Sequence, residues 1–422
     1  MFIRLGQRVC RSALALMLSI SCASADKLNL SVAFPLPSEM RPMHEEIARR
    51  FMEQNRTVAI TFQSPAATYD ELVQRMMREA LVGQTPDVAF HAYNRVQLLV
   101  ERGLPISLDA RIAEEKNWAT MGYLPAMLDL ARINDRVYGL PFNTSTPVIY
   151  YNLDLVRRAG GDAGRLPATW TAVIDLARRI KALGSDTQSI YFDYYDSAGN
   201  WTFLALVESH GGTMMTGDKL AFDGAEGLAA LNILKEIGAA GMVDTTRNQA
   251  LQSFRAGTLG ILVGSTSFLK GLTDGAQGRF EIKTGPFPIS APSGRLPAGG
   301  NAAMIFAKDP AKQTAAWEYV KFATGPIGQT IAVRSSGYMP NNTIAIDDPA
   351  LLGTFYQQSP NHRTSVEQLA FLTGFFNFPG PNSIKITEVI RDHLRNVVTQ
   401  RQDPADALPV IARDVRALLP RP

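Results

Sequence analysis

Apolar residues in the first part of the chain recur with spacings typical of alternating strands and helices. Strand-like runs stand at 27–34 (KLNLSVAF), 58–62 (VAITF) and 87–90 (DVAF). In the segments between and after them, apolar residues return every third or fourth position, which predicts helices at 40–55, 69–82 and 96–102. This β-α-β-α-β order predicts a parallel, doubly wound α/β sheet.

A second α/β region is predicted after residue 138. The apolar runs 148–151 (VIYY) and 259–263 (LGILV) indicate strands, and 285–289 and 302–306 are also expected to be extended. Thr169 is the expected N-cap of one helix, because its hydroxyl can accept a backbone hydrogen bond. Further helices are predicted at 227–237, 249–256, 313–323, 386–398 and 406–419.

These two regions predict two lobes with chain crossings between them. Clusters of proline and glycine mark candidate crossings near 139–141, 285–288 and 324–328. We expect residues 26–138 and about 280–325 to form an N-terminal lobe. Residues 139–279 and about 326–422 are expected to form a C-terminal lobe.

The first 25 residues have the pattern of a secretory signal peptide. Arg4, Arg8 and Arg11 precede the apolar run 13–20 (ALALMLSI), and 23–25 (ASA) fits the small-residue cleavage rule. The apolar run is shorter than the roughly 20 residues that span a bilayer. Lipid anchoring through Cys22 is not expected, because the three residues before it lack the usual leucine. We therefore expect cleavage before Asp26 and export to the periplasm.

Removing this leader changes the charge and the cysteine chemistry of the protein. The whole chain of 422 residues carries a formal charge of +3, but the leader contains three arginines and no acidic residue. The remaining basic and acidic residues balance, so bulk charge does not point to a nucleic-acid partner. Both cysteines also lie in the leader, which excludes disulfides and cysteine-ligated zinc from the mature chain.

Sequence motifs of common enzyme classes are absent. The sequence contains no phosphate-binding G-x-x-x-x-G-K-[ST] loop, no H-E-x-x-H zinc motif and no G-x-S-x-G nucleophile motif. The five histidines stand singly, without metal-ligand spacing. A carboxylate pair for glycoside hydrolysis depends on spatial distance. A secreted hydrolase acting on glycosides or glycerophosphodiesters therefore stays open as an alternative to a binding protein.

Aromatic and hydroxyl side chains in loops are the candidate binding groups. An aromatic cluster includes Tyr191, Phe192, Tyr194, Tyr195 and Trp201. Such rings stack on sugars or hold quaternary ammonium groups, but they also fill cores. The runs 143–146 (NTST) and 264–267 (GSTS) flank predicted strands. Their hydroxyls suit either a polyol or phosphate ligand or ordinary turns and caps.

Several segments in a fixed order resemble the extracellular solute-binding proteins of bacterial ABC importers. They are YGLPFNTSTPVIYYNLDLVRRAGGD (138–162), LPATWTAVIDLARRI (166–180), FRAGTLGILVGSTSF (254–268), KQTAAWEYVKFATGPIGQ (312–329) and SSGYMPNN (335–342). The segment PFNTSTPVIYYN is most similar to the branch that binds sn-glycerol-3-phosphate and glycerophosphodiesters. The resemblance covers most of the chain beyond the leader.

The resemblance implies a two-lobed Venus-flytrap that closes on a solute held between its lobes. The implied solute is a small polyhydroxy molecule: a sugar, a polyol, glycerol phosphate or a glycerophosphodiester. The closed form would dock as a monomer on the membrane subunits of an ABC importer, with no catalysis, cofactor, metal or nucleic acid. A sensor that presents the solute to a membrane receptor is a further alternative.

The resemblance also implies a set of ligand-binding residues. Positions that match the branch are Tyr69, Ser145, Trp201, Ser265, Gly300 and Tyr338. We expect replacement of Trp201 by alanine to weaken binding and to change the unliganded fold little.

Two positions depart from the branch. Tyr93 stands where the branch has a glutamate for glycerol hydroxyls, and we include it as a candidate. A phosphate-binding arginine aligns with Thr387, or with Lys385 if the gap is placed differently. A neutral sugar, polyol or glycerol conjugate therefore stays an alternative to glycerol-3-phosphate.

Overall fold

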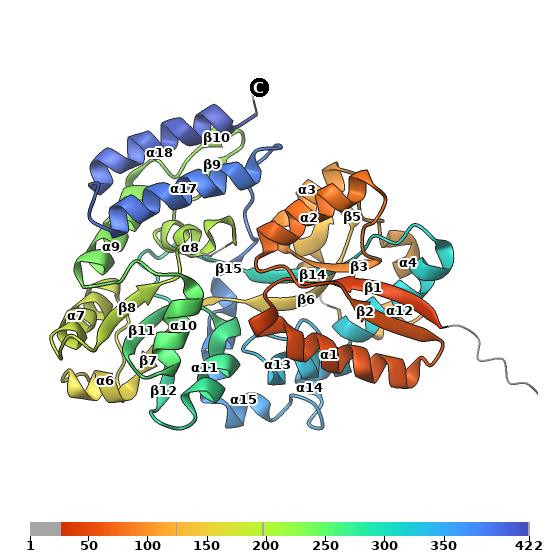
Figure 1. Ribbon diagram of the computed structural model, residues 1–422, viewed down its shortest axis with the longest axis horizontal. Coiled ribbons are helices and arrows are strands. Elements are labelled where there is room, and N and C mark those ends of the chain that lie inside the picture. Colours follow the sequence, from red (N-terminus) through yellow and green to blue (C-terminus); the bar gives the residue numbers. More distant parts are fainter. Residues whose placement is uncertain (1–26, 124, 196–197, 421–422) are drawn as a thin grey trace, which may run out of the picture.

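The protein has two lobes that lie side by side (Figure 1). The computed structural model describes residues 27–123, 125–195 and 198–420. The expected signal peptide, residues 1–25, lies outside this range. Within it, no helix has both the length and the apolar composition needed to cross a membrane.

The first lobe is built on a five-stranded sheet with the order β2-β1-β3-β14-β6. Its strands are β1 (Leu28–Ala33), β2 (Val58–Phe62), β3 (Val88–Ala92), β6 (Leu140–Ser145) and β14 (Gly299–Ile305). Strand β1 pairs in parallel with β2 and β3, as the doubly wound order predicts. Strand β14 is antiparallel to both β3 and β6, because it enters the sheet on the chain's return from the second lobe.

Helices cover both faces of this sheet. They are α1 (Pro37–Gln54), α2 (Tyr69–Leu81), α3 (Tyr93–Glu101), α12 (Pro310–Thr324) and α13 (Pro326–Arg334). One core cluster joins α1 and α12 to the sheet, and another joins α2 and α3 to it. Thr68 caps α2, since its hydroxyl accepts a hydrogen bond from the amide of Glu71 at 3.1 Å. This cap places Tyr69 at the first turn of the helix.

The second lobe is built on a four-stranded sheet with the order β12-β7-β11-β8. Its strands are β7 (Pro147–Asn152), β8 (Gln188–Phe192), β11 (Leu259–Ser265) and β12 (Ile282–Pro286). Strand β11 is parallel to β8, whereas β7 is antiparallel to β11 and β12. Both lobes are therefore α/β, as predicted, with an antiparallel strand inside each sheet.

The second lobe also has helices on both faces of its sheet. They are α6 (Leu153–Arg158), α7 (Trp170–Lys181), α8 (Trp201–Ser209), α9 (Ala225–Ala239), α10 (Arg247–Arg255), α11 (Leu269–Ala276), α17 (Ser383–Val398) and α18 (Pro404–Leu418). Thr169 caps α7 as predicted, accepting from the amide of Ala172 at 3.3 Å. One core joins the sheet to α7, α8, α9, α17 and α18, and another joins it to α10 and α11.

Short elements complete the two lobes. Helices α4 (Asp109–Glu114), α5 (Pro125–Leu128), α14 (Thr343–Asp347), α15 (Phe355–Gln358) and α16 (Pro360–Glu367) lie in the connections. Short strands form three two-stranded pairs: β4 (Arg132–Ile133) with β5 (Arg136–Val137), β9 (Met215–Thr216) with β10 (Lys219–Leu220), and β13 (Leu296–Pro297) with β15 (Leu372–Thr373).

The chain crosses between the lobes later than the sequence indicated. Strand β6 belongs to the first sheet, because Ser145 pairs with Gly299 of β14. Strand β12 belongs to the second sheet, because Ile282 pairs with Asn152 of β7. The expected boundaries at 139 and about 280 therefore move to residue 146 and to 287–298. Helix α13 also stays with the first lobe, since it packs against α1 and α12.

Candidate functional site

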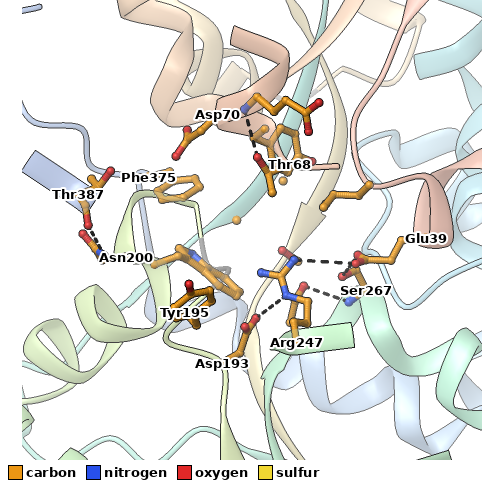
Figure 2. Close-up of a pocket in the computed structure, with 18 of the residues that line it drawn as sticks. Glu39, Thr68, Asp70, Asp193, Tyr195, Asn200, Arg247, Ser267, Phe375 and Thr387 are labelled. Carbon is orange, nitrogen blue, oxygen red and sulfur yellow. Dashed lines mark hydrogen bonds and ion pairs between the residues drawn. The ribbon is translucent and has the colours of Figure 1, made fainter. Parts of the chain in front are cut away.

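A cavity between the lobes collects polar and aromatic side chains from both (Figure 2). The first lobe contributes the start of α1, the start of α2, the end of β6 and the start of β14. The second lobe contributes the ends of β8 and β11 and the starts of α8 and α10. Helix α17 closes one side through Thr387, Glu388 and Arg391.

Six of the seven candidate residues meet in this cavity, although they come from distant parts of the chain. They are Tyr69, Ser145, Trp201, Ser265, Gly300 and Tyr338. Their contact with a ligand remains a prediction, but the fold places them where a solute enclosed by both lobes would touch them.

The two tyrosines are neutral hydroxyl groups on the first-lobe side. Burial raises the pKa of both Tyr69 and Tyr338 well above the ordinary value. The Tyr69 hydroxyl accepts a hydrogen bond from Nδ2 of Asn301 at 2.8 Å. A neutral phenol can also donate, so each can pair with a solute hydroxyl.

Trp201 presents its ring rather than its N–H group to the cavity. Its Nε1 donates to the carbonyl of Pro297 at 3.1 Å, and only 6% of the residue is exposed. The preceding residue, Asn200, adopts a left-handed conformation and donates from Nδ2 to the carbonyl of Thr387 at 2.9 Å. This bond ties the start of α8 to α17 and fixes the position of the indole ring.

Gly300 has a structural reason to be glycine. Its φ is +118°, and a Cβ atom there would lie 1.9 Å from the carbonyl oxygen of Asn143. At the neighbouring Gly299, a Cβ atom would lie 2.6 Å from Oγ of Ser145 and 2.8 Å from the Trp201 ring. The glycine pair therefore allows β14, Ser145 and Trp201 to pack closely.

The sequence was compatible with either capping or ligand binding by Ser265, and the structure shows that Ser265 caps a turn. Its Oγ accepts from the amide of Ser267 at 3.1 Å, at the turn that follows β11. An accepted bond leaves a hydroxyl able to donate its own proton to a ligand.

Tyr93 is not among the residues that line the cavity. It is 5% exposed, and its hydroxyl donates to the carbonyl of Asn143 at 3.0 Å. Tyr93 thus ties α3 to β6 inside the first lobe, and this position does not favour the prediction that it binds ligand.

Charged side chains on the cavity floor were not singled out from the sequence. Arg247 lies between two carboxylates: its Nε is 3.0 Å from Oδ2 of Asp193, and its Nη1 is 4.0 Å from Oε1 of Glu39 (Figure 2). Ser267 donates from Oγ to Oε2 of Glu39 at 3.0 Å. Asp193 directly follows β8. Ligands of α/β proteins bind at the carboxyl ends of strands, so this position could have marked Asp193 as a candidate.

Arg391 replaces Lys385 as the candidate for an anionic group. Lys385 does not line the cavity; its side chain is 60% exposed, and Nζ lies 3.3 Å from Oε2 of Glu388. Arg391 lines the cavity one helical turn after Thr387, with its guanidinium 5.3 Å from the centroid of the Tyr195 ring. It also lies 3.2 Å from Asp392. Because residues four apart lie on the same face of a helix, the alignment at Thr387 could have pointed to Arg391.

The part of the chain that the structure describes contains no cluster of three or more histidine, cysteine or acidic residues able to hold a metal ion. The two fully buried histidines, His44 and His91, lie in the first-lobe core, and burial lowers the pKa of each to about 3. The side chains that line the cavity offer hydrogen bonding, ring stacking and charge pairing.

Comparison with known proteins supports the architecture. Residues 35–330 match the family described as bacterial extracellular solute-binding protein. The sn-glycerol-3-phosphate-binding periplasmic protein UgpB of Escherichia coli K12 is 23% identical over 303 residues, covering 67% of each chain. The UgpB of Agrobacterium fabrum is 25% identical over 282 residues, covering 64% of each.

Solved structures show the same fold. The structure of UgpB from Mycobacterium tuberculosis in complex with glycerophosphocholine has a TM-score of 0.82 at 21% identity, covering 92% of this chain and 98% of that one. A solute-binding protein from Thermotoga lettingae bound with α-D-tagatose has a TM-score of 0.80 at 17% identity, covering 93% and 100%. With the family match spanning most of its length, this chain belongs to the bacterial extracellular solute-binding proteins.

Proposed function

We propose that this protein captures a small polyhydroxy solute between its lobes and delivers it, as a monomer in the periplasm, to the membrane subunits of an ABC importer. The solute class includes sugars, polyols, glycerol phosphate and glycerophosphodiesters. One observation carries the proposal: hydroxyl and aromatic side chains from both lobes line a single cavity. The names of the relatives, which bind glycerol-3-phosphate, glycerophosphocholine and tagatose, support the same class.

The cavity offers a complementary group for each part of such a solute. Tyr69, Ser145 and Tyr338 can exchange hydrogen bonds with hydroxyl groups, and the face of Trp201 can pack on C–H surfaces. Arg391 can hold a phosphate at the side formed by α17. Lobe closure would exclude water and strengthen each of these contacts. The proposal involves no chemical step on the solute.

Native mass spectrometry of protein purified from the periplasm of its own host tests this proposal. We expect a co-purifying small molecule of the stated class, and a calorimetric titration with that molecule should give micromolar or tighter affinity. A parallel panel of sugars, polyols, glycerol-3-phosphate and glycerophosphocholine should include at least one compound that raises Tm.

The control for catalysis is recovery of the solute after long incubation. Recovery of the unchanged compound agrees with a binding protein, whereas its conversion supports the hydrolase alternative. A panel without any binder, together with no co-purifying compound, contradicts the proposed solute class.

A further inference from the structure

Phe375 lies in a short segment, residues 374–378, that contacts both lobes. The segment follows β15 and leads toward α17. Phe376 and Phe378 pack in the second-lobe core, with their ring centroids 5.0 Å apart. Phe375 and Asn377 also contact the first lobe. Alternate side chains of this segment therefore reach different lobes, as in an extended chain.

A buried arginine holds the segment against the first lobe. Arg95 of α3 is fully buried, and its Nη1 donates to Oδ1 of Asn377 at 2.6 Å. Its Nε donates to Oδ1 of Asp70 at 2.8 Å. Hydrogen bonds from a charged donor are stronger than those between neutral groups. The main chain beside Phe375 is therefore fixed relative to α3, although the segment belongs to the second lobe.

The ring of Phe375 lines the cavity and packs against the cores of both lobes (Figure 2). It contacts both core clusters of the first lobe and the second-lobe core that includes α8, α9 and α17. Its centroid is 6.4 Å from that of Trp201, and the two ring planes are 52° apart. Trp201 and Phe375 therefore present two neighbouring aromatic rings to the cavity, and the second ring is held by both lobes.

A phenylalanine ring offers a solute no hydrogen bond. Its face attracts polarised C–H groups and excludes water from them. Such groups occur on the face of a sugar ring and in the methyl groups of a quaternary ammonium. Glycerol-3-phosphate consists of a short chain of hydroxyl groups and a phosphate, and it has no comparable face. Rings in the cavity can therefore discriminate within the proposed solute class.

We propose that Phe375 is a specificity-determining residue that, together with Trp201, receives a C–H-rich face of the solute. The inference rests on the proposed function and narrows it to solutes that have such a face. Because the Phe375 ring packs on both lobes, its contact with the solute is complete only when the lobes are together. A solute that packs on this ring therefore favours the closed arrangement.

Calorimetric titration of the wild type and of Phe375→Leu tests the inference. The probes are D-glucose, D-tagatose, maltose, glycerophosphocholine and sn-glycerol-3-phosphate. Leucine keeps an apolar side chain but has no ring face. We expect Phe375→Leu to weaken binding of a sugar or of glycerophosphocholine about five- to tenfold. Its affinity for glycerol-3-phosphate should stay within about twofold of the wild type.

The probes also identify which C–H groups the ring receives. A loss for the sugars assigns the contact to the face of a sugar ring. A loss for glycerophosphocholine without one for glycerol-3-phosphate assigns it to the methyl groups of choline. Either result supports the inference, whereas a loss confined to glycerol-3-phosphate overturns it.

Phe376→Leu is the matched control, because Phe376 is the next residue of the same segment and is not among the residues that line the cavity. It should bind every probe as the wild type does, and thermal unfolding without solute compares the stability of the variants. Phe375→Met fills the space without a ring and should show the same loss, so it carries the test if Phe375→Leu does not fold. Phe375→Tyr keeps the ring and should retain most of the affinity. An equal loss of affinity in Phe376→Leu overturns the inference.

Failure of the proposed function can be separated from failure of this inference. If the wild type binds none of the probes and no compound co-purifies with it, the proposed solute class and this inference both fall. If the wild type binds a probe and both Phe375→Leu and Phe375→Met bind it equally well, the proposed function stands and the role of Phe375 is overturned.

Discussion

At the scale of single residues, Trp201 is buried in the second lobe and also lines the cavity between the lobes. Its indole N–H is bonded to Pro297, and its ring lies 6.4 Å from that of Phe375, measured between centroids. These contacts lead us to expect, contrary to the prediction from sequence, that replacement by alanine destabilises the unliganded fold. A truncated side chain would leave both a void and an unpaired carbonyl.

Two variants of Trp201 separate these roles. Trp201→Ala should lower the free energy of unfolding by about 3–5 kcal/mol and weaken solute binding by about 1–3 kcal/mol. Trp201→Phe keeps an aromatic face and loses the N–H bond, so it should cost about 1 kcal/mol of stability and retain most of the affinity. Urea denaturation and calorimetry measure the two effects. Unchanged solute affinity in folded Trp201→Ala would show that the ring does not contact the solute.

Arg391 and Lys385 provide a second test at this scale, because both are cations on α17 and Arg391 alone lines the cavity. Arg391→Gln should weaken binding of glycerol-3-phosphate or glycerophosphocholine about tenfold, since a charge-assisted bond contributes roughly 1.5 kcal/mol or more. Affinity for a neutral polyol should change little. Lys385→Gln is the matched control, and an equal loss for it would assign the effect to long-range charge rather than to contact.

At the scale of elements, the pairing of β14 with β6 brings the site together. This pairing sets Gly299 opposite Ser145 and Gly300 opposite Thr144. It also brings residues from the end of one lobe's sheet against Trp201 of the other lobe. The register of these strands thus determines the shape of the cavity wall.

Gly300→Ala tests how strictly that pairing depends on glycine. Its φ of +118° and the 1.9 Å approach to the carbonyl of Asn143 predict a loss of about 3 kcal/mol or more in the free energy of unfolding. Gly278→Ala is the control, because its φ is also positive, at +69°, but no atom lies within 4 Å of the added Cβ. It should lose about 1–2 kcal/mol. Equal losses in the two variants would contradict the close-approach argument.

The elements also show which parts of the structure were open to prediction from sequence. The 3.6-residue period located α2 and α7, and Thr169 was predicted correctly as a cap. Alternation located β1, and short apolar runs located β2, β3, β7 and β11, whereas β8 was missed because its Tyr191 and Phe192 were assigned to a loop. The crossings were placed too early, because β6 and β12 carry the same apolar pattern whichever sheet they join. The pairing partner, which decides the lobe, is a long-range property.

The same distinction holds for the site. Tyr69 and Ser145 could be carried over from a motif, whereas Glu39 and Arg247 meet only through the packing of one lobe on the other. Tyr93 shows the converse: it aligned with a ligand-binding position where the branch has a glutamate, but its hydroxyl is bonded to Asn143 within the first lobe. Matching positions predicts proximity in the fold better than it predicts which side chain faces the cavity.

At the scale of the whole molecule, contacts across the cleft link the two lobes. One is the group on the cleft floor formed by Glu39, Arg247 and Ser267. Another joins Arg95 of α3, through Nη1 at 2.6 Å, to Asn377 in the segment between β15 and α17. Arg95 is fully buried, and its Nε pairs with Asp70 at 2.8 Å. Residues of both links line the cavity: Glu39, Arg247 and Ser267 in the first, and Asp70, the partner of Arg95, in the second. A bound solute can therefore shift the equilibrium between arrangements of the two lobes.

The response of global stability to pH should be set in part by His44 and His91. Both are buried, and His44 is enclosed by aromatic rings, with centroids 4.4 Å from Phe34 and 5.2 Å from Phe142. Burial lowers the pKa of each to about 3, so the unfolded chain binds their protons first, at its ordinary pKa of about 6.5. Their stability contribution is complete above pH 6.5 and decreases as pH falls toward 3.

Substitution of one histidine shows how much it contributes to the change in the free energy of unfolding with pH. Each histidine should reduce the free energy of unfolding by about 1.4 kcal/mol per pH unit well below pH 6.5. Glu208 acts in the opposite sense, because burial raises its pKa to about 7. Urea denaturation of the wild type and of His44→Leu between pH 4.5 and 7.5 isolates one histidine from these other groups. The variant should lose about half of the slope that the two histidines cause, and a slope identical to that of the wild type would show that His44 is not held neutral in the folded protein.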